Sequence, residues 1–339
     1  MAVIHTLLQQ QAQDCRDLGS PFTARVLDLV VGLIGPSTAL GQRLSGEVAP
    51  DHKMPLRLAG ALHHLARAGD PDLAPVYPPH MAGEVALASA LGRALRRAEA
   101  AILPWLEHPP QTNEVARSAV LIAAGHWLTA RYGLPLRLSE VGSSAGLNLL
   151  WDQYGLELPG LRLGPSHPVL TLTPEWRGAL PPCGPPQILD RAGVDLAPLD
   201  PVADRDRLLA FVWADQTARL QRCAAALDLV AQVRPRVARG DAAVWAEARL
   251  AVPNPGAVHL IWHTVVASYF SAKTADHWQA VLAKAGAAAT PDHPLAHLAM
   301  EGDGAAPGAA LTLRLWPGGQ VVPLGRADFH GRWVDWRAP

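Results

Sequence analysis

The sequence predicts an α/β fold, in which a helical N-terminal region precedes an open, mostly parallel sheet with an antiparallel C-terminal hairpin. Residues 1–131 are rich in Ala, Leu and Arg, and their apolar positions recur every three or four residues, as in helices. From Leu136 onward, short apolar runs alternate with helical segments, which is typical of β–α units. Near the C-terminus, WPGGQ lies between two alternating runs and indicates a hairpin turn.

The chain has 339 residues, enough for one large domain or two ordinary ones. We expect a helical region at 1–131, which would cover a substrate, and an α/β domain at 132–339. The apolar periodicity of the first region predicts helices at 26–34, 56–69, 85–108 and 113–133.

In the second region, a Pro- and Gly-rich stretch at about 155–187 predicts an irregular insertion with a small hairpin near 167–173. A strand leading to Asp195 follows. After it the patterns predict, in order, a helix at 206–232, a strand, turn and helix over 235–250, a strand from 256, a helix at 274–287, and strands within 295–302 and 310–336.

The most informative segment is LRLSEVGSSAGLNL, residues 136–149, which predicts a strand, a glycine turn and the start of a helix. Such a turn places backbone N–H groups and a helix N-terminus at one point, where a ligand can approach the backbone. The segment fits two interpretations. As E-x-G-x-x-x-G, from Glu140 to Gly146, it is a nucleotide-type binding turn. As G-x-S-x-G, it is a nucleophile elbow with Ser144 as the catalytic hydroxyl.

The elbow interpretation makes the protein a serine hydrolase. Aspartates and histidines follow Ser144 in the required order, but a chain with 14 histidines and 30 acids meets that condition easily. A hydrolase elbow also follows several strands, whereas the region before Leu136 reads as helical. No HGGG-type segment for an oxyanion hole is present.

The binding-turn interpretation gains from polar residues at the ends of the later strands. Asp195 ends the next predicted strand, where an acid commonly accepts hydrogen bonds from a ribose. Asp241 lies in a Gly-Asp-Ala turn after another strand, and His263 lies near the end of a strongly apolar one. In an open α/β sheet, such groups gather in the crevice at the carboxyl ends of the strands.

In this order, SEVGSSAG, AGVDLAP, ARGDAAVW and VHLIWHTVV resemble the four successive strand ends of class I S-adenosylmethionine-dependent methyltransferases. The resemblance covers roughly residues 113–336 and implies a Rossmann-like, methyltransferase-type sheet. The interval from Gly146 to Asp195 exceeds the usual spacing of about 20 residues, so the insertion is expected to loop out. Ser144 also stands where the usual turn has its middle glycine.

The chain as a whole also resembles a narrower bacterial group, domain-of-unknown-function family 2332. The segments that carry this likeness are PPQTNEVARSA (109–119), SEVGSSAGLNLLWDQY (139–154), GVDLAPLDP (193–201) and FVWADQTARL (211–220).

The methyltransferase resemblance implies S-adenosylmethionine as cofactor and a small-molecule methyl acceptor as substrate, with His263 as a base. The residues that would bind the cofactor are Glu140, Gly142, Ser143, Ser144, Gly146, Asp195, Asp241 and Ala242. Those that would form a lid or contact the acceptor are Gln111, Thr112, Asn113, Glu114, Trp151 and Trp262. The segment PPQTNEV is equally a good helix start with a cap and a first-turn acid. A serine hydrolase and a non-catalytic binding protein with the same fold remain alternatives.

Composition gives no support to several other classes. Lys and Arg number 29 against 30 acids, so no basic field attracts nucleic acid. The three cysteines are scattered and form no C-x-x-C pair, which argues against a cysteine-based zinc site and fits a reducing compartment, and we expect no metal. The first residues lack a signal-peptide pattern, and no apolar run approaches the roughly 20 residues of a membrane helix. We therefore expect a cytoplasmic protein without a membrane partner, of unspecified oligomeric state.

Overall fold

The computed structural model describes residues 2–45, 53–80, 82–107 and 109–338. Contacts divide the chain into two compact units. Unit 1 comprises Met1–Thr112 and Ala203–Ala224, and unit 2 comprises Asn113–Val202 and Ala225–Pro339. The expected boundary at residue 131 therefore lies inside unit 2, and a segment expected in the second domain belongs to unit 1.

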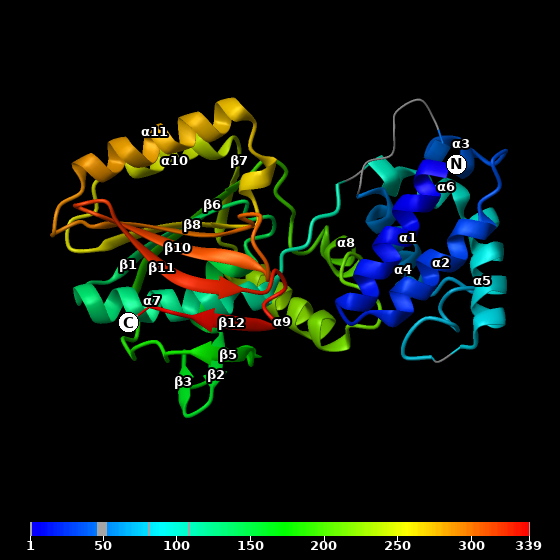
Figure 1. Ribbon diagram of the computed structural model, residues 1–339, viewed down its shortest axis with the longest axis horizontal. Coiled ribbons are helices and arrows are strands. Elements are labelled where there is room, and N and C mark those ends of the chain that lie inside the picture. The colour runs from blue at the N-terminus through cyan, green and yellow to red at the C-terminus, as the bar shows by residue number, and fades with distance from the viewer. Residues whose placement is uncertain (1, 46–52, 81, 108, 339) are drawn as a thin grey trace. The chain divides into compact units, whose positions relative to one another are not determined.

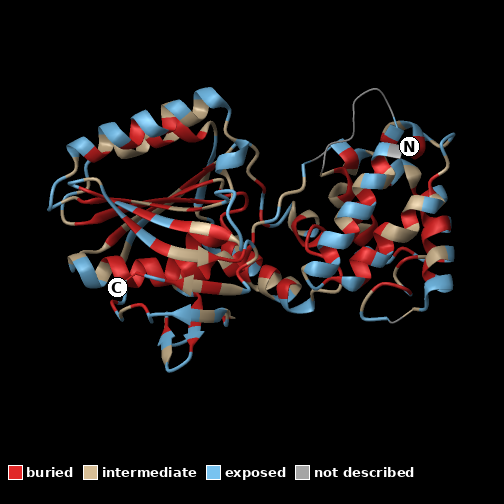
Figure 2. Ribbon diagram, viewed as in Figure 1, coloured by how far each residue is buried: buried red, intermediate tan, exposed pale blue. Residues whose placement is uncertain are grey.

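Unit 1 is a helical bundle whose apolar faces form one core (Figures 1 and 2). Its helices within the described residues are α1 (Ala2–Asp17), α2 (Pro21–Leu33), α3 (Ala39–Ser45), α4 (Met54–Arg67), α5 (Glu84–Arg97), α6 (Glu99–Ile102), the 3-10 helix η1 (Leu103–Glu107) and α8 (Arg205–Ala210). The single helix predicted at 85–108 is instead divided into α5, α6 and η1, and His108 lies outside the described residues.

Hydrogen bonds explain why 203–224 belongs to unit 1. Asp215 caps the start of α2, because its Oδ2 accepts from Phe22 N at 2.9 Å and its Oδ1 from Thr23 Oγ1 at 3.1 Å. The ring of His63 on α4 lies 3.1 Å, at Nδ1, from the carbonyl oxygen of Ala210. The helix predicted at 206–232 is accordingly interrupted between α8 and α9 (Thr217–Val233), where this segment makes these contacts.

Unit 2 contains a nine-stranded sheet with the order β5-β12-β11-β10-β9-β8-β1-β6-β7. Its strands are β1 (Leu136–Val141), β5 (Glu175–Gly178), β6 (Ile188–Asp195), β7 (Arg236–Arg239), β8 (Val258–Thr264), β9 (Leu295–Glu301), β10 (Ala309–Trp316), β11 (Gln320–Ala327) and β12 (Trp333–Trp336). Neighbours from β7 to β9 pair in parallel, whereas β9 to β12 form an antiparallel meander. This is the mostly parallel sheet with an antiparallel C-terminal end that the sequence predicts.

Helices cover both faces of this sheet (Figure 1). The remaining ones are η2 (Val115–Arg117), α7 (Ser118–Tyr132), η3 (Leu147–Gln153), α10 (Ala242–Leu250), η4 (Ala267–Tyr269) and α11 (Ala272–Ala288). α10 and α11 lie on one face, over an apolar layer that includes Val141, Ile261 and Trp278, and α7 lies on the other. Within the described residues, no helix has the length and apolarity needed to cross a membrane.

The insertion at 155–187 forms a small three-stranded sheet of β2 (Gly155–Leu158), β3 (Leu161–Leu163) and β4 (Thr171–Leu172). The prediction of a hairpin near 167–173 is wrong. The hairpin is β2–β3, turned at Gly160, whose φ of 79° suits glycine, and β4 joins it in parallel. The insertion then adds β5 beside β12 at the edge of the large sheet.

The strand order reverses at β1. From β1 the chain continues outward to β6 and β7, and then returns to place β8 on the other side of β1. Every residue of β8 is buried, in keeping with the apolar residues Val258, Leu260, Ile261 and Trp262 in its sequence. Ligands in open α/β sheets bind at such a switch point, outside the carboxyl ends of the strands. The carboxyl ends of β1 and β8 therefore mark the candidate site.

Candidate functional site

The carboxyl ends of four parallel strands present the residues that the sequence singles out. Glu140 lies near the end of β1, Asp195 ends β6, Asp241 follows β7, and His263 lies near the end of β8. The sheet register places Glu140 beside Gly193 of β6 and Trp262 of β8. Parallel pairing brings these four ends to one edge of the sheet.

The glycine turn after β1 is closed by hydrogen bonds to the end of β6. The N–H groups of Gly142 and Ser143 both donate to the carbonyl oxygen of Val194, at 2.8 and 3.1 Å. The N–H of Ser144 donates to Asp195 Oδ2 at 2.8 Å. The backbone is left-handed at three positions, with φ of 75° at Gly142, 51° at Ser144 and 82° at Gly146. The turn thus directs the N–H groups of Gly142, Ser143 and Ser144 to β6, so these groups are not available to a phosphate.

Close packing accounts for two of the glycines. A Cβ at Gly142 would lie 2.4 Å from Cγ2 of Val266, the residue that follows β8 by two positions. A Cβ at Gly193 would lie 2.0 Å from Ser143 Oγ, which donates to the carbonyl oxygen of Glu140 at 2.9 Å. Gly193, two residues before Asp195, therefore allows β6 to approach the turn. The sequence pattern alone does not reveal this close packing.

Glu140 carries a buried carboxyl group that the protein leaves partly unsatisfied. The residue is 3% exposed, and its Oε2 has no hydrogen-bond partner among the residues that the structure describes. Burial raises the pKa of Glu140 well above its usual value, outweighing the nearby indole of Trp262 and hydroxyl of Ser143, which favour the charged form. An unpartnered buried carboxyl is costly and commonly marks a function.

The two aspartates also hold the local backbone. Asp195 Oδ1 accepts from Ala197 N at 2.8 Å, in addition to the contact of Oδ2 with the turn. Asp241 caps α10, and its Oδ2 accepts from Thr274 Oγ1 at 2.9 Å. Although burial alone would raise it, the pKa of Asp241 is lowered by the Val244 N–H, the Thr274 hydroxyl and the Ala243 N–H.

The segment before α7 reaches the turn through Asn113. Its Nδ2 donates to the carbonyl oxygen of Ser143 at 2.6 Å, and its Oδ1 accepts from Asn148 Nδ2 at 3.1 Å. Asn148 Oδ1 in turn accepts from Ser118 Oγ at 2.7 Å. Glu114 accepts from Ala116 N and caps η2, as the helix-start interpretation predicts. The segment is therefore a helix start and also part of the turn's support.

Arg117 joins this segment to β8 and to the loop before β12. Its Nη1 donates to the carbonyl oxygen of Thr264 at 3.1 Å, and its Nε to that of Phe329 at 2.9 Å. Sequence reasoning singled out neither Arg117 nor Asn148, although both lie inside the segments PPQTNEVARSA and SEVGSSAGLNLLWDQY. A polar residue at a predicted buried position, as in GLNLL, was the available signal for Asn148.

His263 is a buried, hydrogen-bonded histidine. It is 4% exposed, and its Nδ1 lies 2.6 Å from Glu301 Oε1 at the end of β9. The same oxygen accepts from the N–H groups of Val266 and Ala267, at 2.8 and 3.2 Å. Burial alone would raise the pKa of Glu301, but His263 and the two N–H groups lower it below its usual value. Glu301 is thus an ionised acceptor, so the proton of His263 lies on Nδ1.

The remaining predicted residues divide between the core, the α10 terminus and unit 1. Trp151 and Trp262 are fully buried, and the indole of Trp151 packs directly on Gly125 of α7. Ala242 is the first residue of α10 and is buried. Gln111 and Thr112 belong to unit 1, whereas Asn113 and Glu114 begin unit 2.

The geometry of Ser144 agrees with a nucleophile elbow in its backbone but not in its hydroxyl contacts. Ser144 is 7% exposed and has the positive φ of a strained turn. Its Oγ, however, has no hydrogen-bond partner within the described residues, so no histidine there is placed to take its proton.

Comparison with known proteins gives a family. No curated protein and no solved structure matches the chain. A family model, described as "Uncharacterized protein conserved in bacteria (DUF2332)", matches residues 5–336, which include both units and every strand of the large sheet. Because the match covers nearly the whole chain, the protein belongs to this bacterial family.

Proposed function

We propose that unit 2 binds S-adenosylmethionine at the carboxyl ends of β1, β6, β7 and β8 and transfers its methyl group to a small-molecule acceptor. The observation that carries the proposal is Glu140. A buried carboxyl with an unpartnered oxygen lies at the switch point of the sheet, where open α/β folds bind ligands.

The charges at this edge favour a cationic nucleoside over a phosphate-bearing one. Glu140, Asp195 and Asp241 place three acids at successive strand ends. The turn amides that would hold a pyrophosphate already donate to Val194 and Asp195. S-adenosylmethionine carries an ammonium and two ribose hydroxyls, which donate hydrogen bonds to carboxylates, and a sulfonium, whose positive charge carboxylates attract. Among nucleotide-type ligands, it therefore fits this donor and acceptor set better than a dinucleotide.

The residues present fit the cofactor through their acids rather than their glycines. Glu140 Oε2 and Ser144 Oγ are buried and unpartnered among the described residues, so each is available to a ligand. The free lone pairs of Asp195 would accept from the ribose, and those of Asp241 from the adenine amino group. The space beside Gly142 is filled by Val266, so this glycine serves packing and not ligand approach.

The cofactor, when bound, supplies an electrophilic methyl group. The protein would then orient the acceptor and exclude water. His263 is suited to one further task in this proposal. Its Nδ1 donates to the ionised Glu301, so Nε2 would be the nitrogen that receives a proton from an acceptor hydroxyl. The carboxylate would stabilise the imidazolium that results.

Calorimetry with S-adenosylmethionine and S-adenosylhomocysteine tests the proposal. We expect both to bind the wild type, and Asp195→Ala to weaken binding at least tenfold because a charge-assisted hydrogen bond contributes about 1.5–3 kcal/mol. Asp276→Ala, which removes an exposed aspartate on α11, is the matched control and should bind like the wild type. No binding by the wild type at millimolar ligand contradicts the proposal. Binding without turnover of any acceptor would identify a non-catalytic protein of this fold.

The serine hydrolase alternative has its own test, because Ser144 has a strained backbone and a buried hydroxyl. We expect a fluorophosphonate probe to leave the wild type unlabelled, since no described histidine contacts Ser144 Oγ. Labelling of the wild type that disappears in Ser144→Ala would instead support the hydrolase. Labelling that persists in that variant would point to a different nucleophile.

A further inference from the structure

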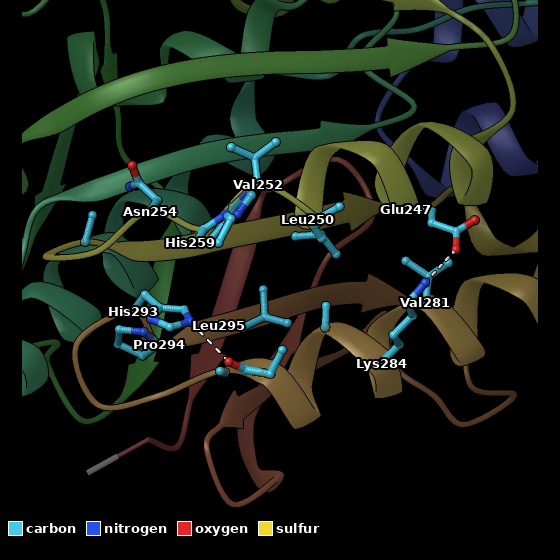
Figure 3. Close-up of a pocket in the computed structure, with 16 residues that line it drawn as sticks. Glu247, Leu250, Val252, Asn254, His259, Val281, Lys284, His293, Pro294 and Leu295 are labelled. Carbon is cyan, nitrogen blue, oxygen red and sulfur yellow. Dashed lines mark hydrogen bonds and ion pairs between the residues drawn. The ribbon is translucent and has the colours of Figure 1, made fainter.

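A pocket lies at the opposite edge of the large sheet, near the amino ends of β8 and β9, and is independent of the proposed cofactor site. Its volume is about 290 Å³, close to the lower end of the range of roughly 300–1,000 Å³ for small-molecule sites. Apolar residues form most of the wall, and they come from α10, α11 and the segments that follow these helices, among them Leu250, Val252 and Ala285. Figure 3 shows this wall with the polar residues His259, Asn254 and His293.

The hydrogen bonds behind the pocket assign the proton of His259. Ser139 Oγ, which is fully buried, lies 2.8 Å from His259 Nε2 and accepts from Arg249 Nε at 3.1 Å. A guanidinium only donates, so the hydroxyl hydrogen of Ser139 is free to donate to Nε2. The opposite assignment would leave that buried hydrogen without an acceptor. Nε2 is therefore the acceptor, and the proton of the neutral ring lies on Nδ1.

Two hydrogen-bond donors of the pocket consequently lack acceptors. Burial, reinforced by the charges of Arg137 and Arg249, lowers the pKa of His259 to about 3, so the ring stays neutral. Among the described residues, the hydrogen-bond partner of the ring is Ser139, at Nε2, which leaves Nδ1–H open. Asn254 Nδ2 is buried and has no partner among them. Both residues line the pocket, so a ligand is the available acceptor.

The charges around the pocket nearly cancel. Arg137 and Arg249 share the single carboxylate of Asp190, at 3.3 and 2.6 Å, which leaves one surplus positive charge. The C-terminal ends of α10 and α11 lie at the pocket, and each contributes about half a negative charge. Lys284 and Glu247 form an ion pair at 3.1 Å. This charge balance favours an uncharged ligand over an anion or a cation.

We propose that this pocket binds a small, uncharged, mostly apolar molecule with a carbonyl group, which accepts hydrogen bonds from His259 Nδ1 and Asn254 Nδ2. The two lone pairs of a carbonyl oxygen match the two donors, and the apolar body fits the apolar wall of the pocket. The pocket binds such a ligand whether or not unit 2 binds S-adenosylmethionine.

Three probes of similar size test the chemistry: acetophenone, ethylbenzene, which lacks the carbonyl, and benzoate, which is charged. In saturation-transfer NMR titrations, acetophenone should bind about tenfold more tightly than ethylbenzene, as expected for two neutral hydrogen bonds, and more tightly than benzoate. With ¹⁵N-labelled histidine, acetophenone should shift the Nδ1 signal of His259. Equal binding of ethylbenzene, or tighter binding of benzoate, would overturn the assignment of the ligand class.

A pair of variants on α11 tests the location. Ala285→Leu fills the pocket, because Ala285 lines it, and should reduce acetophenone binding at least tenfold. Ala283→Leu makes the same change at an exposed position of the helix and should bind like the wild type. Both variants should bind S-adenosylmethionine like the wild type, so this test is separate from that of the proposed function. Unchanged acetophenone binding in Ala285→Leu would refute the site.

Discussion

Replacing Gly142 by alanine is expected to lower the free energy of unfolding of unit 2 by about 2–5 kcal/mol. A left-handed backbone costs a residue with a Cβ about 1–2 kcal/mol, and φ at Gly142 is 75°. The new Cβ would also lie 2.4 Å from Val266 Cγ2, and such overpacking costs about 1–3 kcal/mol. Urea denaturation of the variant and the wild type, followed by circular dichroism, measures the difference.

A double-mutant cycle separates the two costs. Val266→Ala removes the methyl groups that the new Cβ would meet, so Gly142→Ala should cost less in that background. The part that disappears is the steric clash, and the part that remains is the backbone strain. An equal cost in both backgrounds would show that Val266 does not limit the turn. A cost below about 0.5 kcal/mol in the wild type would show that the turn tolerates a side chain.

Local patterns predicted most of the fold of unit 2 because its central strands β1 and β8 are short and largely buried, and β1 is followed by a marked glycine turn. β8 is the clearest case, since its VHLIWHT sequence has every residue buried. The strands of the insertion at 155–187 were harder to predict from the sequence. These small strands depend on pairing with one another and with β12, and β4 has just two residues, so the periodicity of the segment carries little information.

The division into units was less accessible to sequence reasoning for a physical reason. Residues 203–224 follow the parallel strand β6 in the chain, yet Asp215 caps α2 and Ala210 meets His63. These contacts join residues that are 193 and 147 positions apart. A helix period indicates which face is apolar, but it does not indicate which core that face joins.

The strand-end residues of the site were predictable, whereas the network that holds them was not. Glu140, Asp195 and Asp241 are recognisable because each lies at or just after the end of a predicted strand, near a glycine. Asn148 and Arg117 act through contacts with backbone atoms of distant segments, such as the carbonyl oxygens of Glu114 and Thr264. Such contacts follow from the folded path of the chain and leave no spacing signal in the sequence.

Replacing Glu140 by glutamine is expected to stabilise the protein at neutral and alkaline pH. The pKa of the buried carboxyl is raised in the folded state, so folding binds protons above the unfolded value of 4.5. The stability of the wild type therefore falls as pH rises from 4.5 toward the folded pKa. Glutamine does not ionise, so its advantage should be about 1–3 kcal/mol at pH 8 and should vanish near pH 4. Urea denaturation across this pH range measures it.

The same substitution should weaken S-adenosylmethionine binding by about tenfold to a hundredfold, because an ammonium loses its charged acceptor. In the wild type, binding a cation should favour the charged form of Glu140 and release a proton, so affinity should rise with pH below the folded pKa. Glu157→Gln, at an exposed position of β2, is the control and should change neither quantity. A structural role for Glu140 predicts that glutamine lowers stability. Higher stability together with weaker binding is the result expected of a carboxyl that is retained for its ligand, because the folded protein alone gains nothing from its charge.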